Sequence, residues 1–148
     1  MYNDALLQLS KDQALTATAR STNVIEIGNA LQNRNIADGE PLALLIVPKV
    51  NADITTGDET YSAVLQTDDD VAFGSPTTLA TLTLAAAQLQ RGKLSALVLP
   101  LGTPYERYFS VNFVLGGTTP SVTVDCFVVP YSMIPKYSKY YKSGFTIS

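Results

Sequence analysis

Short runs in which apolar and polar residues alternate cover most of the chain between residues 22 and 130. Alternation with a period of two is typical of β-strands with one buried face, whereas an amphipathic helix repeats every three to four residues. The clearest run is 107–115, where Phe109, Val111 and Phe113 share one face. This run is predicted to be a strand.

A second alternating run, 121–129, follows the turn residues Gly116 and Gly117, and Pro130 is expected to stop it. Two alternating runs joined by a short glycine-containing turn are typical of a hairpin. The runs 107–115 and 121–129 are therefore predicted to pair with each other.

Six further runs complete the predicted strands, and two segments among them stand out. The segment 42–47 is apolar at every position, which predicts a central strand covered on both faces. The segment 85–91, AAAQLQR, favours helix and is interpreted as a strand end or a single helical turn. The six runs are 23–27, 42–50, 60–66, 71–73, 78–84 and 94–101.

About eight short strands, separated by Gly, Pro, Asn and Asp, predict an all-β jelly roll or a related Greek-key sandwich. An immunoglobulin-like sandwich is the nearest alternative, but the sequence lacks its cysteine pair and its buried tryptophan. The sandwich is expected to span 22–130. Residues 1–21 are interpreted as an extended N-terminal arm or an added edge strand, and residues 131–148 as a C-terminal tail.

Both ends of the chain, and one loop, are candidates for contacts with other subunits. In the arm, leucines stand amid polar residues, and the alternating TATAR follows at 16–20. Arg34 lies in the long polar loop 28–39, for which an ordinary connection is the alternative. The candidate leucines of the arm are Leu6, Leu7 and Leu9.

The tail differs sharply in composition from the body. Residues 1–130 hold all thirteen acidic residues and seven basic ones, whereas the tail holds three lysines and no acid. Three of its tyrosines are spaced so that one helical turn would bring their rings together, and tyrosine is favoured at interfaces. The tail either docks on another subunit or an acidic partner, or folds back over its own sandwich. Its candidate contact residues are Lys136, Tyr137, Lys139, Tyr140, Tyr141, Lys142 and Phe145.

The composition excludes much of common catalysis. The chain has no histidine, which removes Ser-His-Asp and Cys-His catalysis and most catalytic zinc sites. Its single cysteine cannot form an internal disulfide. No enzymatic activity, metal or cofactor is expected.

The chain has few charged residues, and its net charge is slightly negative. A net charge of −3 and a pI of about 4.7 disfavour binding to nucleic acid. No run approaches the roughly 18 apolar residues of a membrane span, and the N-terminus lacks the basic start of a signal peptide, so synthesis in the cytoplasm without export is expected. Charged residues make up 16%, against about 25% in typical domains, which suits permanent contact with other subunits. A weakly charged free monomer is the alternative.

Three groups could carry chemistry, and each has a structural alternative. The run 68–70 is three aspartates that could bind calcium, but it fails the calcium-loop pattern, and a solvated loop that discourages edge pairing is favoured. Glu106 and Asp125, placed across the predicted hairpin, could be a glycosidase pair, but an ion pair between Arg107 and a cross-strand acid is favoured. Cys126 stands among valines and is interpreted as a small buried hydrophobe.

Four stretches carry a resemblance to a known family: DALLQLSKDQALTATARSTNVIEIG, SPTTLATLTL, LPLGTPYERYFSVNFVLGG and YYKSGFTIS. They resemble the capsid cement proteins of tailed bacteriophages, the group typified by the Bordetella phage cement protein. The resemblance covers nearly the whole chain, and its motifs are packing motifs without chemistry.

This resemblance implies a jelly roll on the outer surface of the virion, where it clamps neighbouring major capsid proteins. It implies a homodimer, with a trimer as the alternative. The charge and hydropathy described above predict no nucleic-acid or membrane partner. It offers no catalytic residues. Two other functions remain open: a carbohydrate-binding jelly roll of the adhesin or lectin type, and a glycosidase that uses Glu106 and Asp125.

Overall fold

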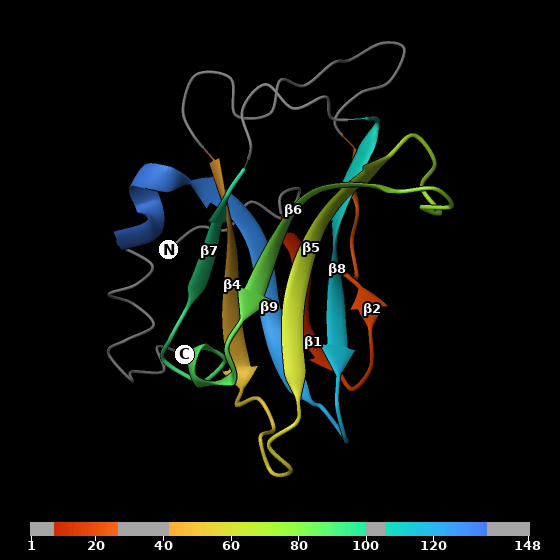
Figure 1. Ribbon diagram of the computed structural model, residues 1–148. Helices are drawn as coiled ribbons and strands as arrows, with labels where there is room; N and C mark the ends of the chain where they lie inside the picture. The colour runs from red at the N-terminus through yellow and green to blue at the C-terminus, as the bar shows by residue number, and fades with distance from the viewer. Residues whose placement is uncertain (1–7, 27–41, 100–105, 136–148) are drawn as a thin grey trace.

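The computed structural model describes residues 8–26, 42–99 and 106–135, which form two antiparallel sheets packed face to face (Figure 1). Sheet A has the strand order β1 (Gln8–Leu15), β9 (Val122–Pro130), β4 (Leu42–Val50) and β7 (Ser95–Val98). Sheet B has the order β2 (Ala19–Arg20), β8 (Tyr108–Gly116), β5 (Thr60–Asp68) and β6 (Thr77–Leu84), and β3 (Ile25–Glu26) also pairs with β8.

The pairing of the strands is that of a jelly roll. The first strand pairs with the last (β1 with β9), β2 and β3 both pair with β8, β4 pairs with β7, and β5 pairs with β6. These pairs nest inside one another, as in one long hairpin wrapped into two sheets. The predicted all-β sandwich is confirmed, and β2 with β3 act as one interrupted strand along β8.

The hairpin predicted from 107–115 and 121–129 does not form, although both runs are strands. β8 pairs with β5 in sheet B, whereas β9 pairs with β1 and β4 in sheet A. The connection between them crosses from one sheet to the other through Gly117, which has a φ of +90°. The prediction was wrong because alternation fixes which face of a strand is buried, but not which strand lies beside it.

Three other predictions change in detail. The strand predicted at 71–73 is a turn, in which the Phe73 N–H donates to the carbonyl of Asp70 at 3.0 Å. The run 94–101 shortens to β7, and 23–27 shortens to β3, with parts of both runs outside the described residues. The segment 85–91 holds a short 3₁₀ helix, η2 (Ala86–Gln88), which is the single helical turn that was one of two interpretations.

The main core lies between the sheets. Phe109, Val111 and Phe113 of β8 point into it and are at most 2% exposed, which confirms the predicted buried face of that strand. From sheet A, β9 contributes alternate residues, with Val124 and Cys126 among them. The alternation along both strands therefore predicted correctly which of their side chains lie in the main core.

A second apolar cluster lies on the outer face of sheet A. Leu45, Val47, Phe127 and Val129 form it, and they are buried although they point away from the main core. The 3₁₀ helix η3 (Tyr131–Met133) begins directly after β9 and carries part of the cover. The prediction that 42–47 is covered on both faces is confirmed. Within residues 8–26, 42–99 and 106–135, no helix is long and apolar enough to cross a membrane.

The described part of the N-terminal segment belongs to the sandwich. Residues 8–15 are β1, the edge strand of sheet A, and residues 19–20 are β2 of sheet B. Of the two interpretations of residues 1–21, an arm or an added edge strand, the described residues take the second.

Candidate functional site

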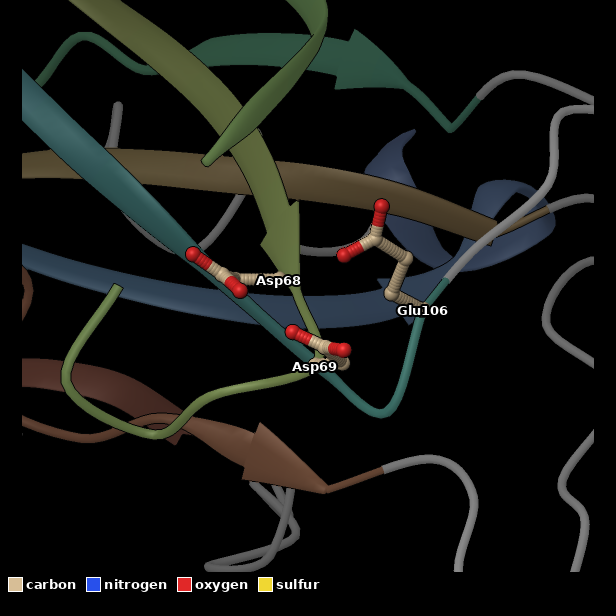
Figure 2. Close-up of side chains that lie close together, drawn as sticks. All are labelled: Asp68, Asp69 and Glu106. Atoms are coloured by element: carbon tan, nitrogen blue, oxygen red, sulfur yellow. The ribbon is translucent and has the colours of Figure 1, made fainter. Parts of the chain in front are cut away.

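Three carboxylates gather at the end of sheet B, where β5 finishes and β8 begins (Figure 2). Carboxylate oxygens of Asp68, Asp69 and Glu106 all lie within 4.8 Å of one another. The register of the strands brings them together, because Asp68 lies opposite Tyr108 in the β5–β8 ladder. The sequence drew attention to 68–70 and to Glu106 separately, but it did not place them side by side.

Hydrogen bonds within the turn after β5 account for the position of Asp68. Its Oδ1 accepts from the backbone N–H of Asp70 at 3.0 Å, and its Oδ2 accepts from the N–H of Ser75 at 3.0 Å. These bonds, the one from Asp70 first, lower the pKa of Asp68 below its ordinary value. Asp68 is buried while Asp69 is exposed, so the interpretation of a solvated run is wrong for Asp68. This carboxylate closes a turn.

Glu106 is held at the same place by the main chain. Its backbone N–H donates to Oγ1 of Thr67 at 2.8 Å, and the same hydroxyl donates to the carbonyl of Tyr108 at 2.8 Å. The carboxylate of Glu106 accepts from Thr77 at the start of β6 at 3.4 Å. The acidic group therefore joins the ends of β5, β6 and β8.

The carboxylate pair considered for glycoside hydrolysis is not formed across a hairpin. Glu106 lies beside sheet B, whereas Asp125 lies in β9 of sheet A. Asp125 accepts from the backbone N–H of Asp12 at 2.7 Å and lies 3.6 Å from Nζ of Lys49. Asp12 ties this residue of β9 to the edge strand β1, and Lys49 ties it to β4.

The predicted ion pair of Arg107 does form, with Glu26 of β3 as its partner. Its Nη2 lies 2.9 Å from Oε1 of Glu26. The favoured interpretation of Arg107 is thus confirmed, and the partner comes from a strand that pairs with β8.

Cys126 is completely buried in the main core. Burial raises the pKa of its thiol far above the ordinary value, and the neighbouring carboxylate of Asp125 adds to this effect. The thiol is protonated at neutral pH, and its interpretation as a small buried hydrophobe is confirmed.

Among the predicted contact residues, the structure describes only Leu9. Its side chain is 0% exposed within the main core, so it has no surface left for another subunit, and its assignment as a contact is wrong. The leucine lies on the inner face of an edge strand, where alternation would have placed it in the core. The remaining predicted contacts lie outside the described residues: Leu6, Leu7, Arg34, Lys136, Tyr137, Lys139, Tyr140, Tyr141, Lys142 and Phe145.

The first residues of the C-terminal tail fold back on their own sandwich. Met133 and Ile134 pack against the outer cluster of sheet A, while Tyr131 is 53% exposed. For residues 131–135 the structure therefore favours the second of the two interpretations of the tail. Residues 136–148 are outside the described part.

The sequence did not single out the edge of sheet B formed by β6. This strand pairs with β5 on one side, and Thr78, Thr81 and Thr83 on it are exposed. In Figure 1 it lies at the side of sheet B away from β2. The signal was available in the run TTLATLTL, which has no charged residue and no proline.

Comparison with known proteins gives one family. The family model Bbp16 matches residues 9–128. The match begins in β1 and ends in β9, so it extends over the jelly roll from its first strand to its last. Among curated proteins, no significant match was found.

Proposed function

The chain belongs to the Bbp16 family, and from this membership we propose that it is a structural protein of a bacteriophage particle. In this proposal it cements or decorates the outside of the capsid by bridging subunits of the major capsid protein. The observation that carries the proposal is the family match over residues 9–128, since the family name points to a Bordetella phage protein. Fold alone would not suffice, because jelly rolls serve many functions.

The strand pairing of the sandwich supports a mechanical role. Nested strand pairs join both ends of the described chain into the sandwich, and β1 is tied to β9 by the Asp12–Asp125 hydrogen bond as well as by the ladder. Pulling either end loose would therefore have to break a strand ladder. A cement protein needs this property, because force must pass from one capsid subunit to the next through it.

The proposed mechanism is thermodynamic linkage. A protein that binds the assembled shell, but not the separated subunits, shifts the balance toward the shell. Two copies acting as a homodimer would straddle a joint between capsid subunits, so that opening the joint breaks contacts on both sides. Modest contacts repeated over the whole shell would add by avidity.

Particles with and without this protein provide the test. The chain is expected to co-purify with assembled heads in a fixed ratio to the shell protein. Heads that lack it should lose their DNA at a lower temperature, and adding the purified protein back should restore the difference. Heads that are equally heat-resistant without it, or purified heads that do not contain it, would contradict the proposal.

A glycan array with the free protein addresses the carbohydrate-binding alternative. Specific glycan binding, together with no affinity for heads, would replace the cement proposal by an adhesin function. Affinity for heads with no glycan signal is the expected result.

A further inference from the structure

We propose that the edge of β6 that pairs with no other described strand is where a second copy of this chain binds, with the two β6 strands pairing antiparallel about a two-fold axis. The two copies of sheet B would then join into one continuous sheet. This inference rests on the proposed function in one respect, because it says where the two copies of the proposed homodimer would contact each other. The argument itself uses only the strand and its neighbours.

β6 is a long edge strand with few of the features that guard an edge against pairing. It spans Thr77–Leu84, it is last in the order of sheet B, and none of its residues is charged or a proline. An edge strand presents unpaired backbone N–H and C=O groups, and proteins that must stay apart normally guard such edges with charge, proline, bulges or short length. β6 has one bulge, between Thr78 and Ala80, and none of the other guards.

The other edges in the described part of the chain are guarded. β1 carries Lys11 and Asp12, its pairing with β9 is interrupted by two register shifts, and Asp12 has a φ of +48°. β7 has four residues and follows closely after Lys93, and β2 and β3 have two residues each. The contrast between β6 and these strands indicates that its open edge has a use.

The strand is complementary to itself under a two-fold axis. An antiparallel pair centred on Leu82 places Thr81 of one copy opposite Thr83 of the other on the outer face. It places Ala80 opposite Leu84 on the core side. Threonine pairs and apolar pairs both favour antiparallel pairing. Because β6 has no charge, the second copy brings no like charge against it.

Pairing would also cover apolar surface that one copy leaves partly open. Within the straight end of the strand, Ala80 and Leu82 pack against the main core but stay partly exposed. A neighbouring strand across the edge covers such side chains in the way that β5 covers its own neighbours. The bulge at Leu79 limits the paired segment to Ala80–Leu84, the straight end of the strand.

The test is a charge placed on this edge. Thr81→Lys puts an ammonium on the outer face of β6 beside the two-fold axis, where the two copies would bring two of them close together. Thr22→Lys is the matched control, because Thr22 is also exposed but lies in the connection between β2 and β3. Analytical ultracentrifugation of the free proteins measures the dimer, and circular dichroism checks that each variant is folded.

The wild-type chain and Thr22→Lys are expected to sediment as dimers with equal dissociation constants. For Thr81→Lys, the dissociation constant should rise about tenfold or more, because like charges oppose strand pairing at an edge. Equal dissociation constants for the Thr81→Lys and Thr22→Lys dimers would overturn the proposal. A monomeric wild-type chain would overturn it too, and loss of head binding by Thr81→Lys would then assign the edge to a strand of the shell protein.

These outcomes separate the edge from the cement function. If Thr81→Lys stays dimeric while heads lacking the protein lose heat resistance, the edge proposal fails and the proposed function stands. If Thr81→Lys is monomeric and heads are equally robust with or without the protein, the edge proposal stands and the proposed function fails.

Discussion

At the scale of single residues, Gly117 controls the crossing between the sheets. Its φ of +90° is costly for any residue with a Cβ. A Cβ at this position would also overlap the carbonyl oxygen of Asp58 and lie 2.8 Å from Cα of Glu59. The backbone of Asp58 and Glu59 cannot easily move away, because these two residues lead directly into β5. Only glycine fits where the chain passes this loop.

Gly117→Ala tests that dependence, with Gly57→Ala as its control. Gly57 also has a positive φ, of +80°, but a Cβ there meets nothing within 4 Å. We expect Gly57→Ala to lower the free energy of unfolding by about 1 kcal/mol, and Gly117→Ala by roughly 3 kcal/mol, because the overlap adds to the strain. Urea unfolding at neutral pH measures both. Equal losses would show that the close approach to Asp58 has no energetic weight.

Side-chain burial was the most predictable property at this scale. Phe109 and Cys126 were placed in the core by alternation alone, and the structure agrees. The contact between Asp68 and Glu106 was not predictable, because it depends on the register of β5 against β8, strands far apart in the sequence. Leu9 was misassigned because its surroundings in the sequence are polar, although its strand faces the core.

At the scale of elements, strand positions were predictable and strand partners were not. The pattern gave β8 and β9 nearly to the residue, yet paired them with each other. A connection of a few residues can close a hairpin or cross between sheets, and the choice depends on contacts with residues distant in sequence. Here the crossing is held by Asp58, whose carboxylate accepts from the N–H of Thr118 at 3.1 Å and from its hydroxyl at 2.9 Å.

This link between two loops should make stability depend on pH. The hydrogen bonds from Thr118 and Thr56, the one from the Thr118 N–H first, lower the pKa of Asp58 below its ordinary 3.8. A carboxyl whose pKa is lower in the folded state stabilises the fold fully above its unfolded pKa. That contribution is lost as the pH falls through the folded pKa. We therefore expect Asp58→Asn to destabilise the protein at neutral pH and to have a smaller effect as the pH falls below the ordinary pKa of 3.8.

Urea midpoints of wild type and Asp58→Asn across this pH range measure the effect. Thr118→Val is the companion variant, since it removes the hydroxyl donor and keeps the backbone N–H, and its effect should be intermediate. A difference between wild type and Asp58→Asn that stays constant with pH would show that the carboxylate acts without its charge.

At the scale of the whole molecule, the structure changes where the C-terminal tail is divided from the sandwich. The basic tail was expected to start at residue 131, after β9. The structure shows that the first residues of this tail serve the fold, because Met133 and Ile134 cover the outer cluster of sheet A. The three lysines begin only at Lys136. A deletion from residue 131 therefore removes a structural cover together with the candidate interface.

Two truncations separate these roles. Deleting 131–148 should expose Leu45 and Phe127 and lower the free energy of unfolding by about 2–4 kcal/mol, as expected for loss of partly buried apolar contacts. Deleting 136–148 leaves Met133 and Ile134 in place, so we expect the stability of the free protein to be unchanged while binding to heads weakens. Thermal unfolding and co-sedimentation with heads measure the two effects. If deleting 136–148 lowers stability and leaves head binding intact, the whole tail is a cover for its own sandwich, and the capsid contact must lie elsewhere on the chain.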